Sequence, residues 1–446
     1  MSPVEDDIRA ALHAEGERLR PLKPLRLPPP DTRPGGWLVP ALAGAIVVLI
    51  AIGLVAVKAI NDGAAHGPAR PVPATSRSDF YPAGTPRYYV SLAGITDVND
   101  ATTLVVGDSL TGARLATIPA PKGTVFIGTT PAAASDDRTF IVGEASQEPK
   151  SHPPVATTSP LGWYLVRISP GARPQVQMTR LPIQVPAADG TVGGAGQMGD
   201  MALSADGTRL AVLFSHGVAV KGLPAGTAAQ QALRVYSVSS GQLLNTWYGT
   251  VIKPGNEQLA EDLSWAGGDS TVAFALTWGL DAHTQIRTVD ISAGGTGLLA
   301  DSHVVWSQYV PLPPGELYTL STPYPCTTPY LAASGQAVVC AYPSYPPGDK
   351  HHVLAWVEYP LSGSRTPRLL GSVPLPPGKL SSASGRVEWV SPAGNEVIGM
   401  WQTIIVGQFK HGSAPTTVRT YVGVAAGGVM RPLNAGTFAP TGEEAW

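Results

Sequence analysis

The chain has 446 residues and a net charge of −2, and only 14% of its side chains are charged, so its electrostatics exclude a basic nucleic-acid-binding protein. Its length suffices for one large or two ordinary domains. Its 50 glycines and 44 prolines make up about a fifth of the residues, which favours many short strands and turns over helices.

Residues 1–36 are predicted to form a cytoplasmic tail with an amphipathic helix and a proline-rich spacer. The helix starts at Ser2-Pro3-Val4-Glu5, a capping box with proline at the first helical position. Apolar residues between Val4 and Leu19 then fall largely on one helical face. The repeated prolines from Pro21 to Pro34 favour polyproline II. Two interpretations stay open: a solvated stub, or a docking helix for a cytoplasmic regulator.

Residues 37–60 are predicted to form one transmembrane helix. From Trp37 to Val57 no side chain is charged, and about 21 residues at roughly 1.5 Å each span about 31 Å, the thickness of a bilayer's hydrocarbon core. The alternative is a cleaved signal peptide. The apolar run is longer than such peptides use, and no clear A-x-A cleavage site follows it, so a retained span is the prediction.

Basic residues are more frequent before the span than after it, which predicts a cytoplasmic N-terminus and an extracytoplasmic C-terminal domain. The five on the first side are Arg18, Arg20, Lys23, Arg26 and Arg33, and the three on the second are Lys58, Arg70 and Arg77. Residues 61–85 are rich in Gly, Ala, Pro and Ser, and are expected to be a flexible linker. The chain is thus predicted to be a single-pass cell-membrane protein.

Residues 86–446 contain two alternating repeats. The first is an apolar pair, a tight turn with Ser, Asp or Gly, and a second apolar run, which predicts a β-hairpin. Its copies include the segments at 135–142, 203–212, 263–268, 333–339 and 390–398, with a truncated copy at 438–442. The second repeat is an alternating strand followed by a glycine turn. Its copies are at 104–112, 164–171, 233–244, 286–294, 353–363 and 418–427.

Six alternating hairpins of each kind describe six four-stranded units, each too thin to bury both faces alone. Radial packing of such units gives an all-β fold, a six-bladed β-propeller, in which the last residues complete the first blade. The repeats leave six or seven blades open. "LSADGTRLAVLF" (203–214) and "VYSVSSGQLL" (235–244) resemble blade motifs of WD40-like and TolB-like propeller proteins. The tail and span together resemble single-pass propeller proteins of high-GC Gram-positive bacteria.

The segment Val106-Gly107-Asp108-Ser109-Leu110-Thr111 is similar to the nucleophile block of GDSL hydrolases, in which Ser109 would attack an ester carbonyl. The adjoining His351 and His352, which follow Asp349, would be the partner base. No G-x-N-D block occurs in the chain, and those enzymes alternate strands with helices. The repeat explains Ser109 as a strand-to-turn residue, so no catalytic residue, metal or cofactor is predicted.

Cys326 and Cys340 are the two cysteines of the chain, and both follow the span, so a disulfide is expected, with two buried thiols as the alternative. Prolines between Trp306 and Tyr345 predict a long loop here. Its tyrosines are a candidate binding surface for a glycan or an envelope protein, or a roof over a blade edge. The candidate residues are Tyr318, Tyr324, Tyr330, Tyr342 and Tyr345.

These patterns predict a membrane-anchored, extracytoplasmic binding or scaffold module without enzymatic activity. One alternative is a transmembrane signal transducer whose tail binds a regulator such as a sigma factor. The other is an envelope ester hydrolase. Propellers carry many unrelated functions, so the fold alone does not decide among them.

Overall fold

In the computed structural model, the chain divides into two compact units, Met1–Ile52 and Gly53–Trp446. The structure describes residues 84–97, 100–127, 131–146, 160–171, 174–184, 197–218, 228–252, 258–278, 283–309, 326–342, 353–363, 366–374, 380–406, 416–433 and 444–445. The predicted tail helix and the predicted span at 37–60 lie outside these residues. Among the described residues, no helix is long and apolar enough to cross a bilayer.

The described part of the second unit is all-β, and four of its sheets have four strands each. The first two contain β9 (Gln197–Leu203), β10 (Arg209–Val218), β11 (Ala228–Ser237) and β12 (Leu243–Ile252), then β13 (Gln258–Ala266), β14 (Thr271–Trp278), β15 (His283–Asp290) and β16 (His303–Tyr309). The next two contain β17 (Thr327–Leu331), β18 (Ala337–Tyr342), β19 (Val353–Pro360) and β20 (Arg368–Pro374), then β21 (Leu380–Val390), β22 (Glu396–Val406), β23 (Thr416–Ala426) and β24 (Val429–Pro432). In each sheet, consecutive strands are antiparallel neighbours.

A fifth sheet has nine strands and consists of two halves joined by one short strand. Strand β4 pairs with β2 on one side and with β6 on the other. The first half contains β1 (Tyr88–Asp97), β2 (Asp100–Asp108), β3 (Arg114–Pro119) and β25 (Glu444–Ala445). The second contains β5 (Ala132–Ala133), β6 (Thr139–Ser146), β7 (Pro160–Ile168) and β8 (Val176–Arg180), and β4 (Thr124–Ile127) lies between the halves.

The predicted hairpins form where the described residues cover them. In the β9–β10 hairpin, Leu203 pairs with Leu210, and Gly207 at the turn has φ +72°, a left-handed conformation that glycine adopts without steric cost. The strands are rich in Val, Ile, Leu, Tyr and Thr, which suit the pleated sheet. One prediction was wrong: the stretch expected to be one long loop between Trp306 and Tyr345 contains β17 and β18.

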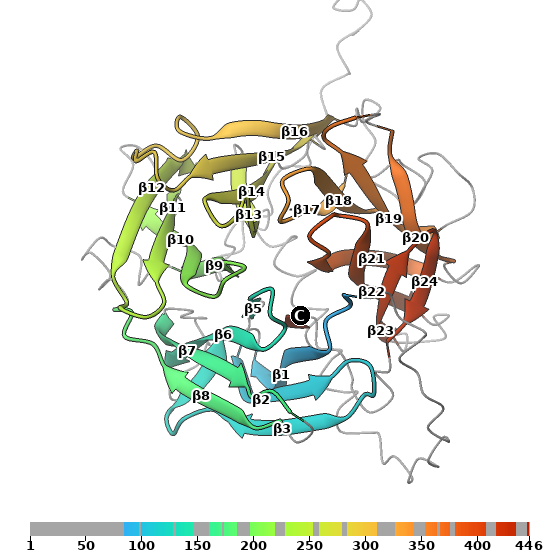
Figure 1. Ribbon diagram of the computed structural model, residues 1–446, viewed down its shortest axis with the longest axis horizontal. Helices are drawn as coiled ribbons and strands as arrows, with labels where there is room; N and C mark the ends of the chain where they lie inside the picture. Colours follow the sequence, from blue (N-terminus) through green and yellow to red (C-terminus); the bar gives the residue numbers. More distant parts are fainter. Residues whose placement is uncertain are drawn as a thin grey trace, which may run out of the picture. The chain divides into compact units, whose positions relative to one another are not determined.

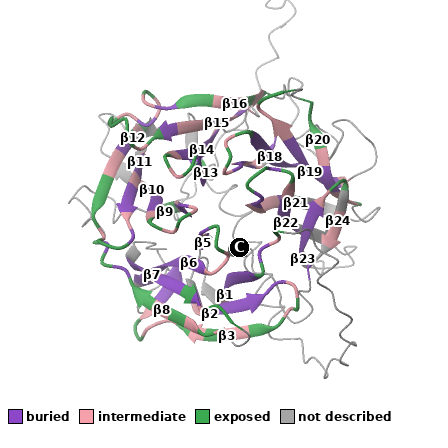
Figure 2. Ribbon diagram, in the orientation of Figure 1, coloured by how far each residue is buried: buried purple, intermediate pink, exposed green. Residues whose placement is uncertain are grey.

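The first strands β9, β13, β17 and β21 lie innermost in the ring of sheets, and β12, β16, β20 and β24 lie outermost (Figure 1). The middle strands are the most buried, and the outermost strands are the most exposed (Figure 2). All six residues of β18 are buried, whereas β16 has only exposed and half-buried residues. The arrangement is consistent with a β-propeller.

Among the described residues, buried apolar side chains form six clusters, and each cluster joins two neighbouring sheets or sheet halves. Together, the six clusters join each sheet or sheet half to the one before it and to the one after it, so every sheet buries both faces. Pairs of residues that represent the six clusters are Val90 with Val166, Trp163 with Phe214, Trp247 with Trp265, Ile286 with Val338, Trp356 with Trp401, and Tyr89 with Met400. Each fully buried aromatic or aliphatic side chain contributes about 1.5–3 kcal/mol of hydrophobic stabilisation.

The two ends of the described domain meet in one sheet. Strand β25 pairs with β1 through Val90 opposite Ala445 and Ser91 opposite Glu444. This confirms the prediction that the last residues complete the sheet that the first strand begins. The hairpins on the inner strands are also hydrogen-bonded to one another, which fixes neighbouring sheets at their turns. These backbone bonds run from Ser135 to Ala205 at 3.1 Å, from Gly267 to Ala333 at 3.1 Å and from Ser334 to Pro392 at 3.1 Å.

Candidate functional site

Charged side chains from three innermost strands gather on the inner side of the sheets. Asp200 comes from β9, Glu261 and Asp262 from β13, and Arg386 and Glu388 from β21. The charges of the other four all act on Asp262, so each of them lies within electrostatic reach of that residue. We call these five residues the inner carboxylate cluster. Four of the five are acidic, and Arg386 is the single cation among them.

Interruptions of the strand pairing position these side chains. The pairing register shifts in β9 beside Asp200, in β13 between Glu261 and Ser264, and in β21 at Glu388. A β-bulge re-aims the side chain that it carries. Asp262 sits in its bulge at φ +52°, a left-handed conformation that aspartate adopts more readily than most residues. Bulges on three separate strands thus bring the carboxylates to one place.

Asp200 is held by two backbone amides. Its Oδ2 accepts a hydrogen bond from Leu263 N–H at 2.5 Å, and its Oδ1 accepts one from Met201 N–H at 2.8 Å. Desolvation raises the pKa of Asp200 to about 6. The charge of Glu261 raises this pKa further, whereas the two amide hydrogen bonds and the charge of Arg386 lower it. The carboxyl group therefore exchanges protons near neutral pH.

Three of its neighbours also have raised pKa values. Desolvation and the charges of Glu261 and Asp200 raise the pKa of Asp262, a half-buried group, well above its usual value. Burial raises the pKa of Tyr330 in β17 to about 12, and the charge of Asp200 adds to it. Glu261 is exposed and accepts a hydrogen bond from Thr277 Oγ1 at 2.9 Å. Desolvation raises its pKa, but solvent screening weakens that effect.

The cluster thus combines several carboxyl groups with raised pKa values and one guanidinium group. Such a set can bind an organic cation, or it can donate and accept protons during a reaction. Within the described residues, no group of three or more His, Cys, Asp or Glu side chains has metal-binding geometry, so the cluster is not described as a metal centre.

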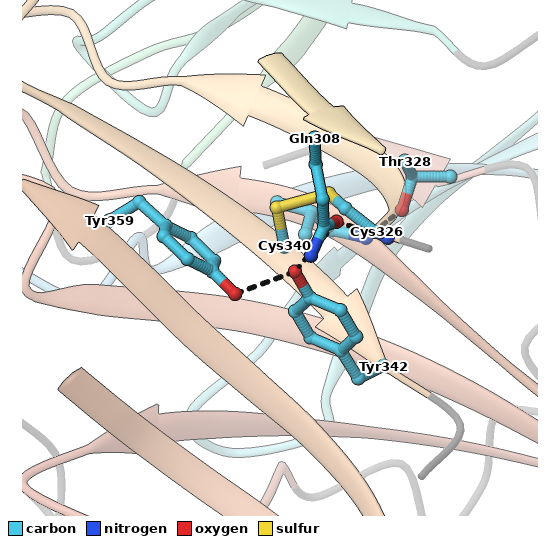
Figure 3. Close-up of a disulfide and its surroundings, with 7 residues drawn as sticks. Gln308, Cys326, Thr328, Cys340, Tyr342 and Tyr359 are labelled. Atoms are coloured by element: carbon cyan, nitrogen blue, oxygen red, sulfur yellow. Dashed lines mark hydrogen bonds between the residues drawn. A yellow bond between two sulfur atoms is a disulfide. The ribbon is translucent and has the colours of Figure 1, made fainter. Parts of the chain in front are cut away.

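Cys326 and Cys340 form a disulfide bond, with their Cα atoms 5.2 Å apart (Figure 3). Cys340 lies in β18 and Cys326 immediately precedes β17, and both are buried. The backbone N–H of Cys326 also donates to Gln308 Oε1 at 2.9 Å, so the bridge is connected to the neighbouring sheet. The disulfide lies inside the packed domain, so its role is structural.

Two of the five residues of the predicted tyrosine surface, Tyr330 and Tyr342, lie within the described residues. Tyr342 is 1% exposed, and its hydroxyl is hydrogen-bonded to Gln308 Oε1 at 3.0 Å and to the hydroxyl of Tyr359 at 2.7 Å (Figure 3). Tyr330 is a half-buried strand residue beside Asp200. Because strands β17 and β18 carry them, neither belongs to a projecting loop. The other three, Tyr318, Tyr324 and Tyr345, lie outside the described residues.

Ser109 has a structural role. It is 3% exposed, and its Oγ donates to the carbonyl of Pro86 at 2.6 Å. The adjacent Asp108 accepts hydrogen bonds from Arg87 Nε at 2.8 Å and from the two backbone amides that follow Ser109. The GDSL-like segment therefore forms the strand-to-turn connection that the repeat predicts. His351 and His352, the candidate base, lie outside the described residues.

No family model and no curated protein matches the sequence. Solved structures that resemble the chain include an oligogalacturonate lyase, with 11% identity over 71% of this chain and 73% of that one and a TM-score of 0.34. The acylaminoacyl peptidase of Pyrococcus horikoshii shows 9% identity over 74% of this chain, with a TM-score of 0.35. Prolyl oligopeptidase B of Galerina marginata shows 12% over 78%, with a TM-score of 0.34. The matches span 41% of the length of each peptidase.

These neighbours are propeller-like proteins and include enzymes, so the prediction that the chain has no enzymatic activity is corrected. That prediction extended the absence of a catalytic motif to the whole fold, and the fold is one that enzymes also use. At this level of identity the likeness concerns the fold, and it assigns no substrate to this chain.

Proposed function

We propose that the chain is a single-pass membrane protein whose residues 86–446 form an extracytoplasmic six-bladed propeller that binds a ligand. Four four-stranded sheets and a nine-stranded sheet with two halves support the proposed blade count. The membrane assignment rests on the apolar run at 37–60 and on the basic residues before it.

The inner carboxylate cluster carries the ligand-binding proposal. Four acidic side chains meet there with one arginine, and the raised pKa of Asp262 reflects a site with more carboxyl groups than positive charge. A ligand that carries an ammonium group would supply the missing charge and would stabilise the ionised form of Asp262. The ligand class is therefore amine-bearing, such as an amino sugar of an envelope glycan or a lysine side chain of an envelope protein.

Titration calorimetry with spermidine tests this proposal on the full-length chain purified in a neutral detergent. Measurements in two buffers of different ionisation enthalpy count the protons released. We expect binding to release protons, because a nearby cation lowers the raised pKa of Asp262. Asp262→Asn should abolish most of the release and weaken binding about tenfold or more. The matched control is Asp290→Asn, an exposed turn residue. Absent binding, or binding without proton release, would rule the proposal out.

A hydrolase is the second candidate, favoured by the proximity of Asp200, with a pKa of about 6, to Asp262, whose pKa is also raised. Two neighbouring carboxyl groups with raised pKa values can act as base and acid in the same reaction. We would measure hydrolysis of p-nitrophenyl acetate and p-nitrophenyl glycosides against pH. Activity that rises with an apparent pKa near 6, falls at least a hundredfold in Asp200→Asn and survives Ser109→Ala supports this candidate. Activity lost in Ser109→Ala contradicts it.

A further inference from the structure

A groove of about 530 Å³ opens between the outer parts of two neighbouring sheets, away from the inner carboxylate cluster. Its walls come from the segment after β8, from β11 and β12, and from the turn that joins these two strands. They bear amide, hydroxyl and aromatic groups around one arginine. The lining residues used below are Gln184, Arg234, Tyr236, Gln242, Thr246 and Tyr248.

The turn of the groove is fixed by a close approach of two chain segments. Gly241 has φ +70°, and a Cβ atom on it would lie 2.3 Å from the carbonyl oxygen of Pro182, so only glycine fits there. On the opposite wall, the pairing register of β11 and β12 shifts between Val235 and Tyr236. The outermost strand β12 thereby bends opposite Tyr236, and Tyr236 and Arg234 of β11 line the groove at this bend. The groove is thus part of the folded backbone and needs no rearrangement to form.

The floor of the groove contains polar atoms that the protein itself leaves unsatisfied. Tyr236 is 2% exposed, and its Oη makes no hydrogen bond of standard geometry with any described residue, although Arg234 lies close enough to lower its pKa. Arg234 Nε likewise has no partner of standard geometry among the described residues. Outside the groove lining, the same is true of Nε1 of Trp163, whose ring lies 6.0 Å from that of Tyr236. Leaving a buried polar atom unpaired costs about as much as losing a hydrogen bond, so most such atoms have partners in folded proteins.

The charge of the groove is positive. Arg234 Cζ lies 5.4 Å from the ring centre of Phe214, a cation–π contact that holds the guanidinium group in place. None of the ion pairs among the described residues involves Arg234. Burial raises the pKa of Tyr236, whereas hydrogen bonding with Arg234 and the charge of Arg234 lower it. The pKa remains above the ordinary value of 10, so the hydroxyl keeps its proton at neutral pH and can donate a hydrogen bond. The groove therefore presents a guanidinium group and a hydroxyl donor side by side.

We propose that this groove binds an oxyanion, carboxylate or phosphate, carried on a ligand the size of a sugar ring. Arg234 and the Tyr236 hydroxyl donate to the anion. Gln184, Gln242 and Thr246 offer amide and hydroxyl groups to the polar body of the ligand. Tyr248, which is 43% exposed, provides a ring face for stacking. The volume lies within the range of small-molecule sites.

The test compares glucuronate, glucose 6-phosphate and glucose by titration calorimetry and thermal shift on the full-length chain in neutral detergent. The three share the ring and differ in the group at one end. We expect at least one of the two acids to bind and to raise the melting temperature, and neutral glucose to bind at least tenfold more weakly. The two acids distinguish a carboxylate site from a phosphate site. Equal binding of glucose, or no binding by either acid, overturns the proposal.

Tyr236→Phe provides the decisive variant, because it removes the unpaired hydroxyl and keeps the packed ring. We expect the variant to be as stable as the parent or more stable, and to bind the acid about tenfold more weakly. Tyr342→Phe is the matched control: it removes a hydroxyl that has two hydrogen bonds, so it should lower stability and leave the affinity unchanged. Unchanged affinity in Tyr236→Phe, or a loss of stability equal to that of the control, contradicts the proposal. Spermidine binding at the inner cluster should not change in either variant, which separates this test from that of the proposed function.

Discussion

The Oδ1 atom of Asp269 accepts a hydrogen bond of 2.7 Å from the backbone N–H of Ala205, which lies 64 positions earlier in the chain. Its Oδ2 atom accepts a second bond from Asp206 N–H at 3.1 Å, and its carbonyl oxygen accepts one from Arg209 Nη1 at 2.7 Å. Asp269 has φ +67°, which aims its carboxylate at the neighbouring hairpin. One turn residue thus joins two sheets.

Asp269→Ala removes both side-chain hydrogen bonds between these sheets. Because the acceptor is charged and the two amides lose their partner, we expect the free energy of unfolding to fall by about 1–3 kcal/mol. Urea denaturation followed by tryptophan fluorescence measures the change. Asp290→Ala is the control, since that exposed carboxylate bonds within its own turn, and it should cost under about 0.5 kcal/mol. Equal effects of the two variants would show that Asp269 does not join the sheets.

Gly399→Ala should be strongly destabilising for a steric reason. A Cβ atom at position 399 would lie 2.2 Å from Cε2 of Trp356, a fully buried ring whose Nε1 donates to the carbonyl of Arg386. Moving this ring disturbs the packing between two sheets, at a cost of about 1–3 kcal/mol or more. At Gly199 the nearest atom would be at 3.6 Å, so Gly199→Ala should have little effect. Thermal denaturation compares them, and a mild Gly399→Ala variant would contradict the packing described for Trp356.

Reduction of the disulfide should lower stability measurably. Cys326 and Cys340 are 14 positions apart, and in the chain-entropy model a closed loop of about 15 residues contributes about 3 kcal/mol. Urea denaturation with and without reductant tests this in the parent chain. The variant with both cysteines changed to alanine should resemble the reduced parent and ignore the reductant. An unchanged urea midpoint after full reduction would refute the prediction.

The stability of the domain should depend on pH through Asp200. The folded-state pKa of about 6 exceeds the ordinary value of 3.8, so the folded protein binds more protons between these values. The contribution of this carboxyl group is full below about pH 4 and is lost as the pH rises through 6. The shift sets an upper limit of about 3 kcal/mol before solvent screening.

Asp200→Asn should remove this part of the pH dependence. Glu261, Asp262, Tyr330, Arg386 and Glu388 surround the group and remain in the variant. The quantity to measure is therefore the difference in urea midpoint between parent and variant at pH 4, 5, 6 and 7. We expect the difference to shift in favour of the variant as the pH rises. A difference that stays constant over this range would contradict the raised pKa.

Truncation after residue 443 removes β25 and leaves an edge of β1 without its partner. Two pairs, Val90 with Ala445 and Ser91 with Glu444, are lost, so we expect a decrease of about 1–2 kcal/mol in the free energy of unfolding. Glu444→Ala keeps the backbone pairing and serves as the control. Equal stability of the truncated and parent chains in urea would show that this pairing does not contribute.

Local patterns in the sequence determined much of the fold. Alternating apolar residues and glycine turns predict strands and hairpins from neighbours in the chain, and the hairpins at 203–212 and 233–244 form as expected. The even number of cysteines likewise predicts the bridge. The proline-rich stretch between Trp306 and Tyr345 was wrongly predicted to be one long loop. Edge strands tolerate proline, and the edge strand β17 contains Pro329.

Only the tertiary structure decided where the candidate sites lie. Asp200, Asp262 and Arg386 are more than 60 positions apart along the chain, and bulges, which leave no period in a sequence, bring them together. The groove at Arg234 could not be predicted from the sequence either, because it depends on how closely the segment after β8 approaches the sheet of β11 and β12. Strand patterns are set by nearest neighbours, whereas the burial of Tyr342 is set by packing between sheets, and no local pattern encodes that packing.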